Sequence, residues 1–154
     1  MRKLLTYSGF LCLFAVLAAC EKEERISGEP SAPISPVPEI WLGNMPLQYS
    51  QFDDVTIPVN YRDGDGDIGF ANADSAVVFV TDNRADLLIT FHVPPLAPPD
   101  ANVAITGKLE VVVENIILLN TSGNPETTTF SVRLRDRAGN WSNEVVTPQL
   151  TIQP

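Results

Sequence analysis

The sequence predicts an all-β protein whose single domain is an antiparallel β-sandwich of about seven strands. After residue 38, nearly every apolar stretch either alternates with polar residues or is a short β-branched run, as in strands. Turn-forming residues separate these stretches, and none of them carries a 3.6-residue apolar stripe with helix caps. Residues 39–154 are also numerous enough to bury one hydrophobic core.

The expected strands follow one another at short intervals. They span residues 40–42, 55–62, 76–81, 87–93, 103–105, 109–119, 127–135 and 145–152. The segment 109–119 is predicted as a strand rather than a helix because it is rich in β-branched side chains. Pro58 predicts an irregularity within its strand, since proline cannot donate a ladder hydrogen bond. The proline-rich run at 94–99 predicts a stiff loop.

The first 38 residues are predicted to lie outside this domain. Residues 1–19 have the form of a signal peptide, with Arg2 and Lys3 before an apolar stretch. The motif Leu17-Ala18-Ala19-Cys20 resembles the lipobox of bacterial lipoproteins, which implies cleavage before Cys20 and acylation of that cysteine. Stable anchoring in a membrane takes more than one acyl chain. An ordinary secretory peptide is the less favoured alternative.

Residues 20–38 are expected to be the lipidated cysteine and a flexible proline-rich tether. They contain four prolines among polar residues and few large apolar side chains, so they cannot supply a core. The acidic run at 21–24 resembles the export signal of bacterial lipoproteins that reach the cell surface, and a solvated run of charge explains it equally well. The expected location is therefore the outer membrane, on its periplasmic or its cell-surface face.

The mature chain is strongly acidic. Loss of Arg2 and Lys3 with the leader would leave eight basic residues against nineteen acidic ones, a net charge of −11. This charge opposes binding to nucleic acid and favours cations, basic ligands or simple solubility. With Cys12 removed and Cys20 acylated, no thiol would remain for a disulfide, a zinc site or nucleophilic catalysis.

The run Asp63-Gly64-Asp65-Gly66-Asp67 directly follows a predicted strand. Its carboxylates continue the parity of the apolar row at 55, 57, 59 and 61, so the core face would end in oxygen ligands. Asp74 stands twelfth, counted from Asp63, where calcium loops of the EF-hand kind place a carboxylate. The glycines are displaced and no helices flank the loop, so we reject an EF-hand and expect a calcium site on a β scaffold. Oxygen ligands without His or Cys favour calcium over a transition metal.

The segment 130–148 resembles the final hairpin of immunoglobulin-like or fibronectin type III-like domains of bacterial surface proteins. The motif Asp136-Arg137-Ala138-Gly139-Asn140 stands at its turn. The whole chain also resembles small bacterial outer-membrane lipoproteins of uncharacterised function, in which a strand runs into Asp-Gly-Asp-Gly-Asp-Ile-Gly, here residues 63–69. These resemblances imply an immunoglobulin-like sandwich and say little about activity, because this architecture hosts many functions.

In an immunoglobulin-like topology, the loops after strands 55–62 and 127–135 lie at the same end of the sandwich. The apolar row at 130, 132 and 134 runs by the same parity into Asp136. The expected ligands of one calcium ion are therefore the acidic residues of these loops: Asp63, Asp65, Asp67 and Asp74, joined by Asp136 or Asn140. The alternative, equally favoured, is a solvated acidic turn in which Asp136 only shapes the hairpin.

An enzyme is the least favoured class of function. His92 is the only histidine and lies on the polar parity of its strand, and no nucleophile-elbow or metalloprotease motif is present. We expect a membrane-anchored, non-catalytic binding or adhesion module that contacts a glycan, a peptide or a larger outer-membrane protein. Trp141 is the candidate contact aromatic, with a role in covering the end of the core as the alternative. The competing function is a structural accessory subunit of an outer-membrane complex.

Overall fold

The computed structural model describes residues 33–154, which form ten strands and no helix. The strands are β1 (Glu39–Leu42), β2 (Gln48–Ser50), β3 (Val55–Asp63), β4 (Val78–Asp82), β5 (Leu87–Phe91), β6 (Ile105–Val113), β7 (Glu126–Thr128), β8 (Phe130–Leu134), β9 (Val145–Val146) and β10 (Leu150–Gln153). Within this range, no helix has the length and apolarity needed to cross a membrane. The predicted signal peptide, Cys20 and most of the predicted tether lie outside the described residues.

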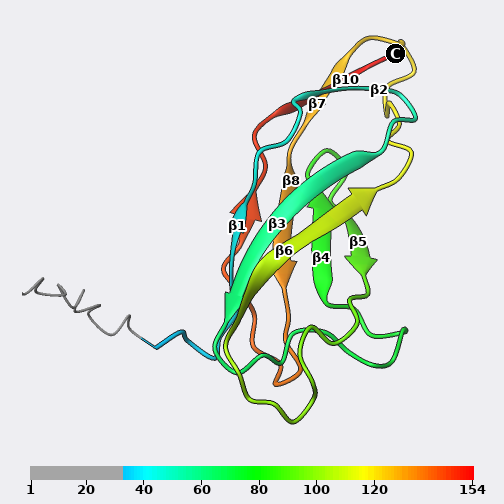
Figure 1. Cartoon of the computed structure of the whole chain (residues 1–154). Helices are drawn as coiled ribbons and strands as arrows, with labels where there is room; N and C mark the ends of the chain where they lie inside the picture. The colour runs from blue at the N-terminus through cyan, green and yellow to red at the C-terminus, as the bar shows by residue number, and fades with distance from the viewer. Residues whose placement is uncertain (1–32) are drawn as a thin grey trace, which may run out of the picture. The chain divides into compact units, whose positions relative to one another are not determined.

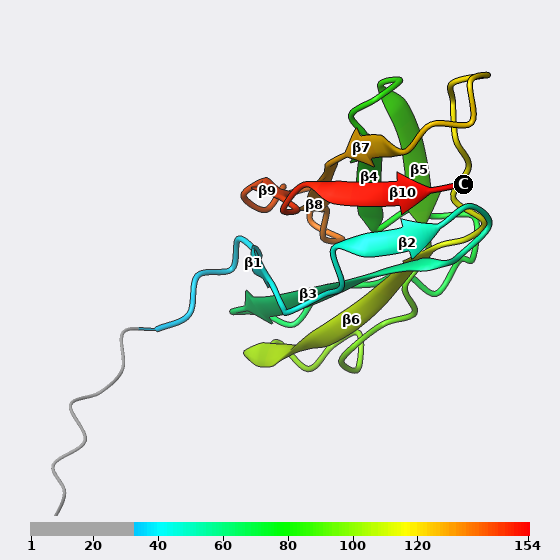
Figure 2. The same ribbon diagram turned by 90° about the horizontal axis from the view of Figure 1, so that it is seen from above.

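The strands form three sheets arranged as a sandwich (Figures 1 and 2). One layer is the sheet β1-β3-β6, and the other is the sheet β5-β4-β8-β9. The third sheet, β2-β10-β7, continues from β8 and β9 towards the end of the domain where the C-terminus lies (Figure 1). All paired strands are antiparallel except β2 and β10, which run parallel. The prediction of an all-β, mainly antiparallel fold is confirmed.

The core lies between the two layers and follows the strand alternation. One buried cluster contains the inward rows of the central strands: Val55, Ile57 and Val59 of β3, Val78 and Val80 of β4, and Phe130, Val132 and Leu134 of β8. Alternate side chains of a strand point to opposite faces, so each inward row builds the core, while the side chains of the opposite face are partly or fully exposed except for the buried Pro58. The inward parity predicted for β3 and β8 is therefore confirmed.

The boundaries of several strands differ from the prediction. The predicted strand 127–135 divides at Thr129 into β7 and β8, and the predicted strand 145–152 divides around Pro148 into β9 and β10. β2 was not predicted, because three residues carry too little periodicity to stand out. If β1 with β2, β7 with β8, and β9 with β10 are each counted once, the ten strands become the expected seven.

The predictions for 103–105 and 109–119 were wrong in their limits. β6 starts at Ile105, continues through Gly107 without a break and ends at Val113. Beyond it, Asn115 has a φ of 52°, a left-handed conformation that does not continue a strand. The apolar residues at 116–119 lie in a loop instead.

Pro58 lies within β3 without interrupting the strand. It is paired opposite Glu110 of β6, and the ladder between these strands runs unbroken from Val55 to Asp63. β1 ends at Leu42, opposite Val59, and the carbonyl of Pro58 accepts only the N–H of Gly43, at 2.8 Å. Pro58 has no N–H to donate, but it lies opposite a position where β1 has already ended. No ladder hydrogen bond is therefore lost.

Candidate metal centre

The acidic loop, residues 63–69, lies at the end of the sandwich where β3 and β8 finish (Figure 1). The hairpin turn after β8 is bonded to it. The N–H of Arg137 donates to the carbonyl of Asp67 at 3.2 Å, and the N–H of Ala138 donates to Asp67 Oδ2 at 2.8 Å. Arg137 also donates from Nη1 to the carbonyl of Gly69 at 2.9 Å. The structure thus joins two loops that are about seventy residues apart in the chain.

The carboxylates of Asp63, Asp65 and Asp67 converge. Each of the three offers an oxygen that lies within 4.8 Å of the other two. Asp63 is fully buried, and its Oδ2 accepts the N–H of Asp67 at 3.0 Å. The Oδ1 atoms of all three are buried and have no hydrogen-bond partner among the described residues. Buried acceptors are nearly always satisfied in folded proteins, by protein groups, water or an ion, so three such oxygens together form a group that could hold a metal ion.

The electrostatics of the loop support the same conclusion. The pKa of Asp63 is raised to about 6, chiefly by burial; the charges of Asp65 and Asp67 contribute to the rise, while the N–H of Asp67 opposes it. Burial also raises the pKa of Asp67, and the charges of Asp136 and Asp65 add to this effect. The ionised loop is therefore unfavourable by itself, and a bound cation would remove that penalty.

The structure brings together three of the five predicted ligands. Asp74 is exposed, outside this group of carboxylates, and its N–H donates to Asn72 Oδ1 at 3.0 Å. Asp136 is fully buried, but Asn140 occupies both of its oxygens: the backbone N–H donates to Oδ1 at 2.7 Å and Nδ2 to Oδ2 at 2.9 Å. Asp136 therefore acts on the group through the shape of the hairpin and through its charge near Asp67.

Two glycines of the loop allow other segments to approach it. A Cβ at Gly64 would lie 2.3 Å from the carbonyl oxygen of Ile34, and the N–H of Gly64 donates to the carbonyl of Ser35 at 2.8 Å. A Cβ at Gly66, whose φ is +74°, would lie 2.4 Å from the carbonyl oxygen of Val103. These contacts could not be predicted from the sequence, because the approaching segments are distant in the chain.

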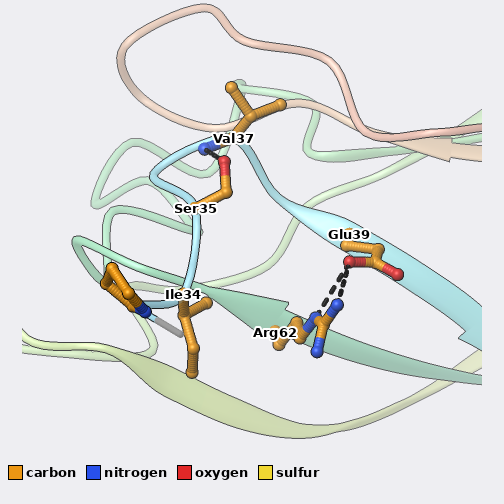
Figure 3. Close-up of a pocket in the computed structure, with 6 residues that line it drawn as sticks. Ile34, Ser35, Val37, Glu39 and Arg62 are labelled. Carbon is orange, nitrogen blue, oxygen red and sulfur yellow. Dashed lines mark hydrogen bonds and ion pairs between the residues drawn. The ribbon is translucent and has the colours of Figure 1, made fainter. Parts of the chain in front are cut away.

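The segment 33–38, which enters the domain beside the acidic loop, forms a small pocket with β1 and β3 (Figure 3). Ser35 Oγ accepts the N–H of Val37 at 3.0 Å, and Arg62 pairs with Glu39 at 2.6 Å. Both members of this ion pair are about half exposed, so it adds little to stability. The pocket shows that the end of the predicted tether contacts the domain immediately next to Asp63.

Trp141 lies on the outer face of the sheet β5-β4-β8-β9, against Phe79 of β4 and Arg133 of β8. It forms an isolated bridge with Arg135, and its ring lies 4.7 Å from that of Phe79, centroid to centroid. The side chain remains 38% exposed and is not part of the buried core cluster. Trp141 is therefore available to solvent from the face of a regular sheet.

A buried ion cluster at the other end of the domain was not predicted from the sequence. Arg84 pairs with Asp82 at 2.6 Å and with Glu126 at 2.9 Å, and donates to the carbonyl of Ile117 at 2.9 Å. Burial alone would raise the pKa of Asp82, but the hydrogen bonds from Arg84 and Thr128 outweigh it and lower the pKa. The carboxylate oxygens of Asp82 and Glu126 all have hydrogen-bond partners. The cluster is therefore structural, and it holds the loop after β6 through the carbonyl of Ile117.

His92, the candidate surface residue, is exposed, and its Nδ1 lies 3.1 Å from the carbonyl oxygen of Ser75. Comparisons with known proteins add no functional assignment: no protein-family model matches the chain, and neither a curated protein nor a solved structure was found to match it.

Proposed function

We propose that the protein is a membrane-anchored, non-catalytic binding module whose loop end is organised by one calcium ion held by Asp63, Asp65 and Asp67. The observation that carries the calcium site is the set of three buried Oδ1 atoms without hydrogen-bond partners among the described residues. Backbone carbonyls or waters would complete the coordination, since calcium takes six to eight oxygens.

The ligand requirements of the two ions favour calcium over magnesium. Calcium binds six to eight oxygens in flexible geometry, whereas magnesium demands near-ideal octahedral geometry and is usually held by one or two carboxylates with several waters. Here three carboxylates offer oxygens within 4.8 Å of one another. The absence of nitrogen and sulfur ligands in this group argues against a transition metal.

The domain that carries the site is proposed to be an immunoglobulin-like sandwich. In the constant-type arrangement the first, second, fourth and fifth strands share one sheet, and the third, sixth and seventh share the other. With the interrupted strands counted once, the sheets β1-β3-β6 and β5-β4-β8-β9 agree with this division except for the fourth strand, β5, which pairs with β4 at the edge of the second sheet. The proposal gains further support from the hairpin motif at 136–140.

The membrane anchor is proposed from the lipobox-like residues 17–20 and the apolar stretch before them. A Cys20→Ala variant should lose incorporation of labelled fatty acid and leave the membrane fraction, because no acyl chain can then attach. Wild-type protein that stays unlabelled, or a variant that remains in the membrane fraction, would contradict lipid anchoring. The proposed calcium site does not depend on either result.

Calcium binding is tested by calorimetric titration and thermal melting of the full chain with calcium chloride, and with magnesium chloride for comparison. We expect heat and a rise in melting temperature with calcium at millimolar concentration or below, and neither in Asp63→Asn. Asp74→Asn is the matched control: it removes the same charge from the same region at an exposed position and should bind normally.

Two outcomes of the titration would contradict the proposal. One is wild-type protein that shows neither heat nor a shift in melting temperature at millimolar calcium. The other is loss of binding in Asp74→Asn to the same degree as in Asp63→Asn, which would mean that the ion sits in a loop arranged differently from the one described above.

A further inference from the structure

The basic residues of the domain divide into two groups. Three of them form ion pairs with nearby carboxylates: Arg62 with Glu39, Arg84 with Asp82, and Lys108 with Glu110. The other three have no ion pair among residues 33–154 and follow one another along β8 and the turn after it: Arg133, Arg135 and Arg137. In a chain with a large excess of acid, unpaired arginines gathered at the end of β8 and in the following turn mark a place where an anion would be attracted.

Two of these arginines lie against Trp141. The guanidinium carbon of Arg133 is 4.8 Å from the centroid of the tryptophan ring, and that of Arg135 is 5.8 Å away. Arg133 is exposed, whereas Arg135 Nε is buried without a hydrogen-bond partner in the described part of the chain. Arg137 is directed elsewhere, to the carbonyl of Gly69. The cationic surface is therefore centred on Arg133, Arg135 and Trp141.

A shallow hollow of about 260 Å³ opens beside this surface. Its lining combines an exposed aromatic ring, a cation, two hydroxyl groups and a carboxylate, supplied by Trp141, Arg133, Thr81, Ser131 and Glu144. Thr81 and Ser131 are register partners on adjacent strands, so the two hydroxyls stand side by side on the outer face. The hollow is too small for a folded partner and is the size of one or two sugar rings.

The position of the hollow favours a sugar over an extended peptide. β4 is paired with β5 on one side and β8 on the other, and β8 is paired with β4 and β9. Most backbone groups of these two strands are therefore already bonded. A peptide captured by strand addition needs a free strand edge, which the middle of this sheet does not offer. A pyranose ring instead presents an apolar face to an aromatic side chain and hydroxyls to polar ones.

We propose that this hollow binds a sugar that carries a carboxylate, such as a uronic acid residue. Arg133, whose guanidinium already lies over the Trp141 ring, pairs with the carboxylate through its planar fork of donors. Thr81 and Ser131 bond the hydroxyls of the sugar, and the exposed part of Trp141 contacts its apolar face. The proposal rests on the proposed function only in treating the domain as a binding module. It does not depend on calcium, because none of the three carboxylates of the metal centre lines the hollow.

The probe is trigalacturonate, with neutral galactotriose for comparison, titrated into the full chain by calorimetry. All solutions contain EDTA, because uronates bind calcium themselves. We expect binding of the acidic sugar that weakens with salt, and at least about tenfold weaker binding in Arg133→Gln. Arg62→Gln is the matched control, since it removes the same charge from the opposite sheet and should bind as the wild type does.

Several outcomes would overturn this proposal. They are no binding of trigalacturonate at millimolar concentration, equal affinity for the neutral sugar, or unchanged affinity in Arg133→Gln when its melting temperature matches the wild type. Equal binding of a short poly-glutamate peptide would identify a general anion site and refute the sugar. A calcium titration of the same protein, without EDTA and without sugar, keeps the two proposals apart: a calcium response without sugar binding refutes only the sugar site.

Discussion

At the scale of single residues, Asp63 shows which properties of a side chain the local sequence pattern can predict. Its burial could be predicted from the sequence, because it continues the parity of the inward row of β3. Its grouping with Asp65 and Asp67 was also expected from their spacing. The exposure of Asp74 and the hydrogen bonds from Asn140 to Asp136 were not predicted. Both contacts are local to their own turns, and the spacing of the acidic residues does not show which oxygens such a turn already occupies.

The raised pKa of Asp63 predicts a distinctive dependence of stability on pH. In metal-free protein the folded state holds a proton up to about pH 6, while the unfolded chain releases it near 3.8. The folded state thus binds more protons between these values, and its free energy of unfolding falls as pH rises from about 4 to about 6. Asp63→Asn should lack this contribution and keep the one from Asp67, whose pKa is also raised.

Urea unfolding in EDTA at pH 4.5 and pH 7 measures this effect as the difference between wild type and Asp63→Asn. The subtraction removes the opposite contribution of Asp82, whose lowered pKa stabilises the fold above pH 4. A variant whose advantage over the wild type is the same at both pH values would show that Asp63 titrates normally.

The partner of Asp136 provides a second prediction at this scale. Asn140→Ala removes the Nδ2 donor and leaves Asp136 Oδ2 buried without that hydrogen bond. A buried acceptor left unsatisfied costs about 1–3 kcal/mol, and we expect a loss of this size in chemical denaturation. Asn72→Ala is the control, because its side chain accepts a hydrogen bond at an exposed turn and should cost well under about 1 kcal/mol. Equal losses in both would contradict the role given to Asn140.

At the scale of elements, the regular alternation of apolar and polar residues predicted strands correctly, whereas the points at which strands are interrupted were not predicted. β3 and β8 were predictable because an alternating row needs only local information. The breaks at Thr129 and around Pro148 mark where the chain passes from one sheet to another, which depends on pairing with strands far along the sequence. The segment 116–119 misled the prediction because its apolar side chains lie in a loop held by Arg84, not in a strand.

Two glycines allow a matched test of the acidic loop. Gly66 and Gly123 have similar positive φ values, +74° and +68°, so alanine suffers similar backbone strain at both. A Cβ at Gly66 would meet the carbonyl oxygen of Val103 at 2.4 Å, whereas nothing lies within 4 Å of one at Gly123. Gly66→Ala should therefore lower the free energy of unfolding by at least about 1 kcal/mol more than Gly123→Ala. Equal losses in denaturant titrations would show that the loop does not pack on Val103.

The ion cluster around Arg84 leads to a prediction about the stability of the loop after β6. Arg84→Met leaves Asp82 buried and without its charge partner, and breaking a buried pair in this way costs about 3–5 kcal/mol. Arg62→Met breaks a half-exposed pair and should cost at most about 1 kcal/mol. Thermal and urea unfolding measure both. A loss from Arg84→Met no larger than that from Arg62→Met would mean that the cluster does not hold the loop.

At the scale of the whole domain, the two long sides of the sandwich differ. On one side, Asn143 acts as a bridge between the layers: its Nδ2 donates to the carbonyl of Ile40 at 2.8 Å, and its Oδ1 accepts the N–H of Ile40 at 2.9 Å. On the other side, β5 and β6 are edge strands with no strand partner beyond them in the described chain. Leu87 and Leu88 of β5 are both more than half exposed there. If the protein served as an accessory subunit, this edge is where a partner strand would add.

The end of the sandwich around Asp63 is where the chain enters the domain. The acidic loop bonds to the segment 33–38 through Gly64 and to the hairpin after β8 through Asp67, while the C-terminus lies at the opposite end (Figure 1). Topology allowed the two loops to be placed together from sequence, but the contact of Ser35 with Gly64 has no local signal. A cation bound here would therefore stiffen the point from which the predicted tether leaves the domain.

This arrangement predicts that calcium slows hydrogen exchange at the entry point more than elsewhere. The Gly64 amide, bonded to Ser35, and the Ala138 amide, bonded to Asp67, should exchange more slowly when calcium neutralises the loop and opposes its local opening. The Asn83 amide, bonded to Thr129 at the far end of β4, is the internal control and should change much less. Exchange monitored by NMR with and without calcium measures all three. If calcium binds but the Gly64 and Ala138 amides exchange no more slowly, or slow only as much as Asn83, the ion does not couple the acidic loop to the segments around it.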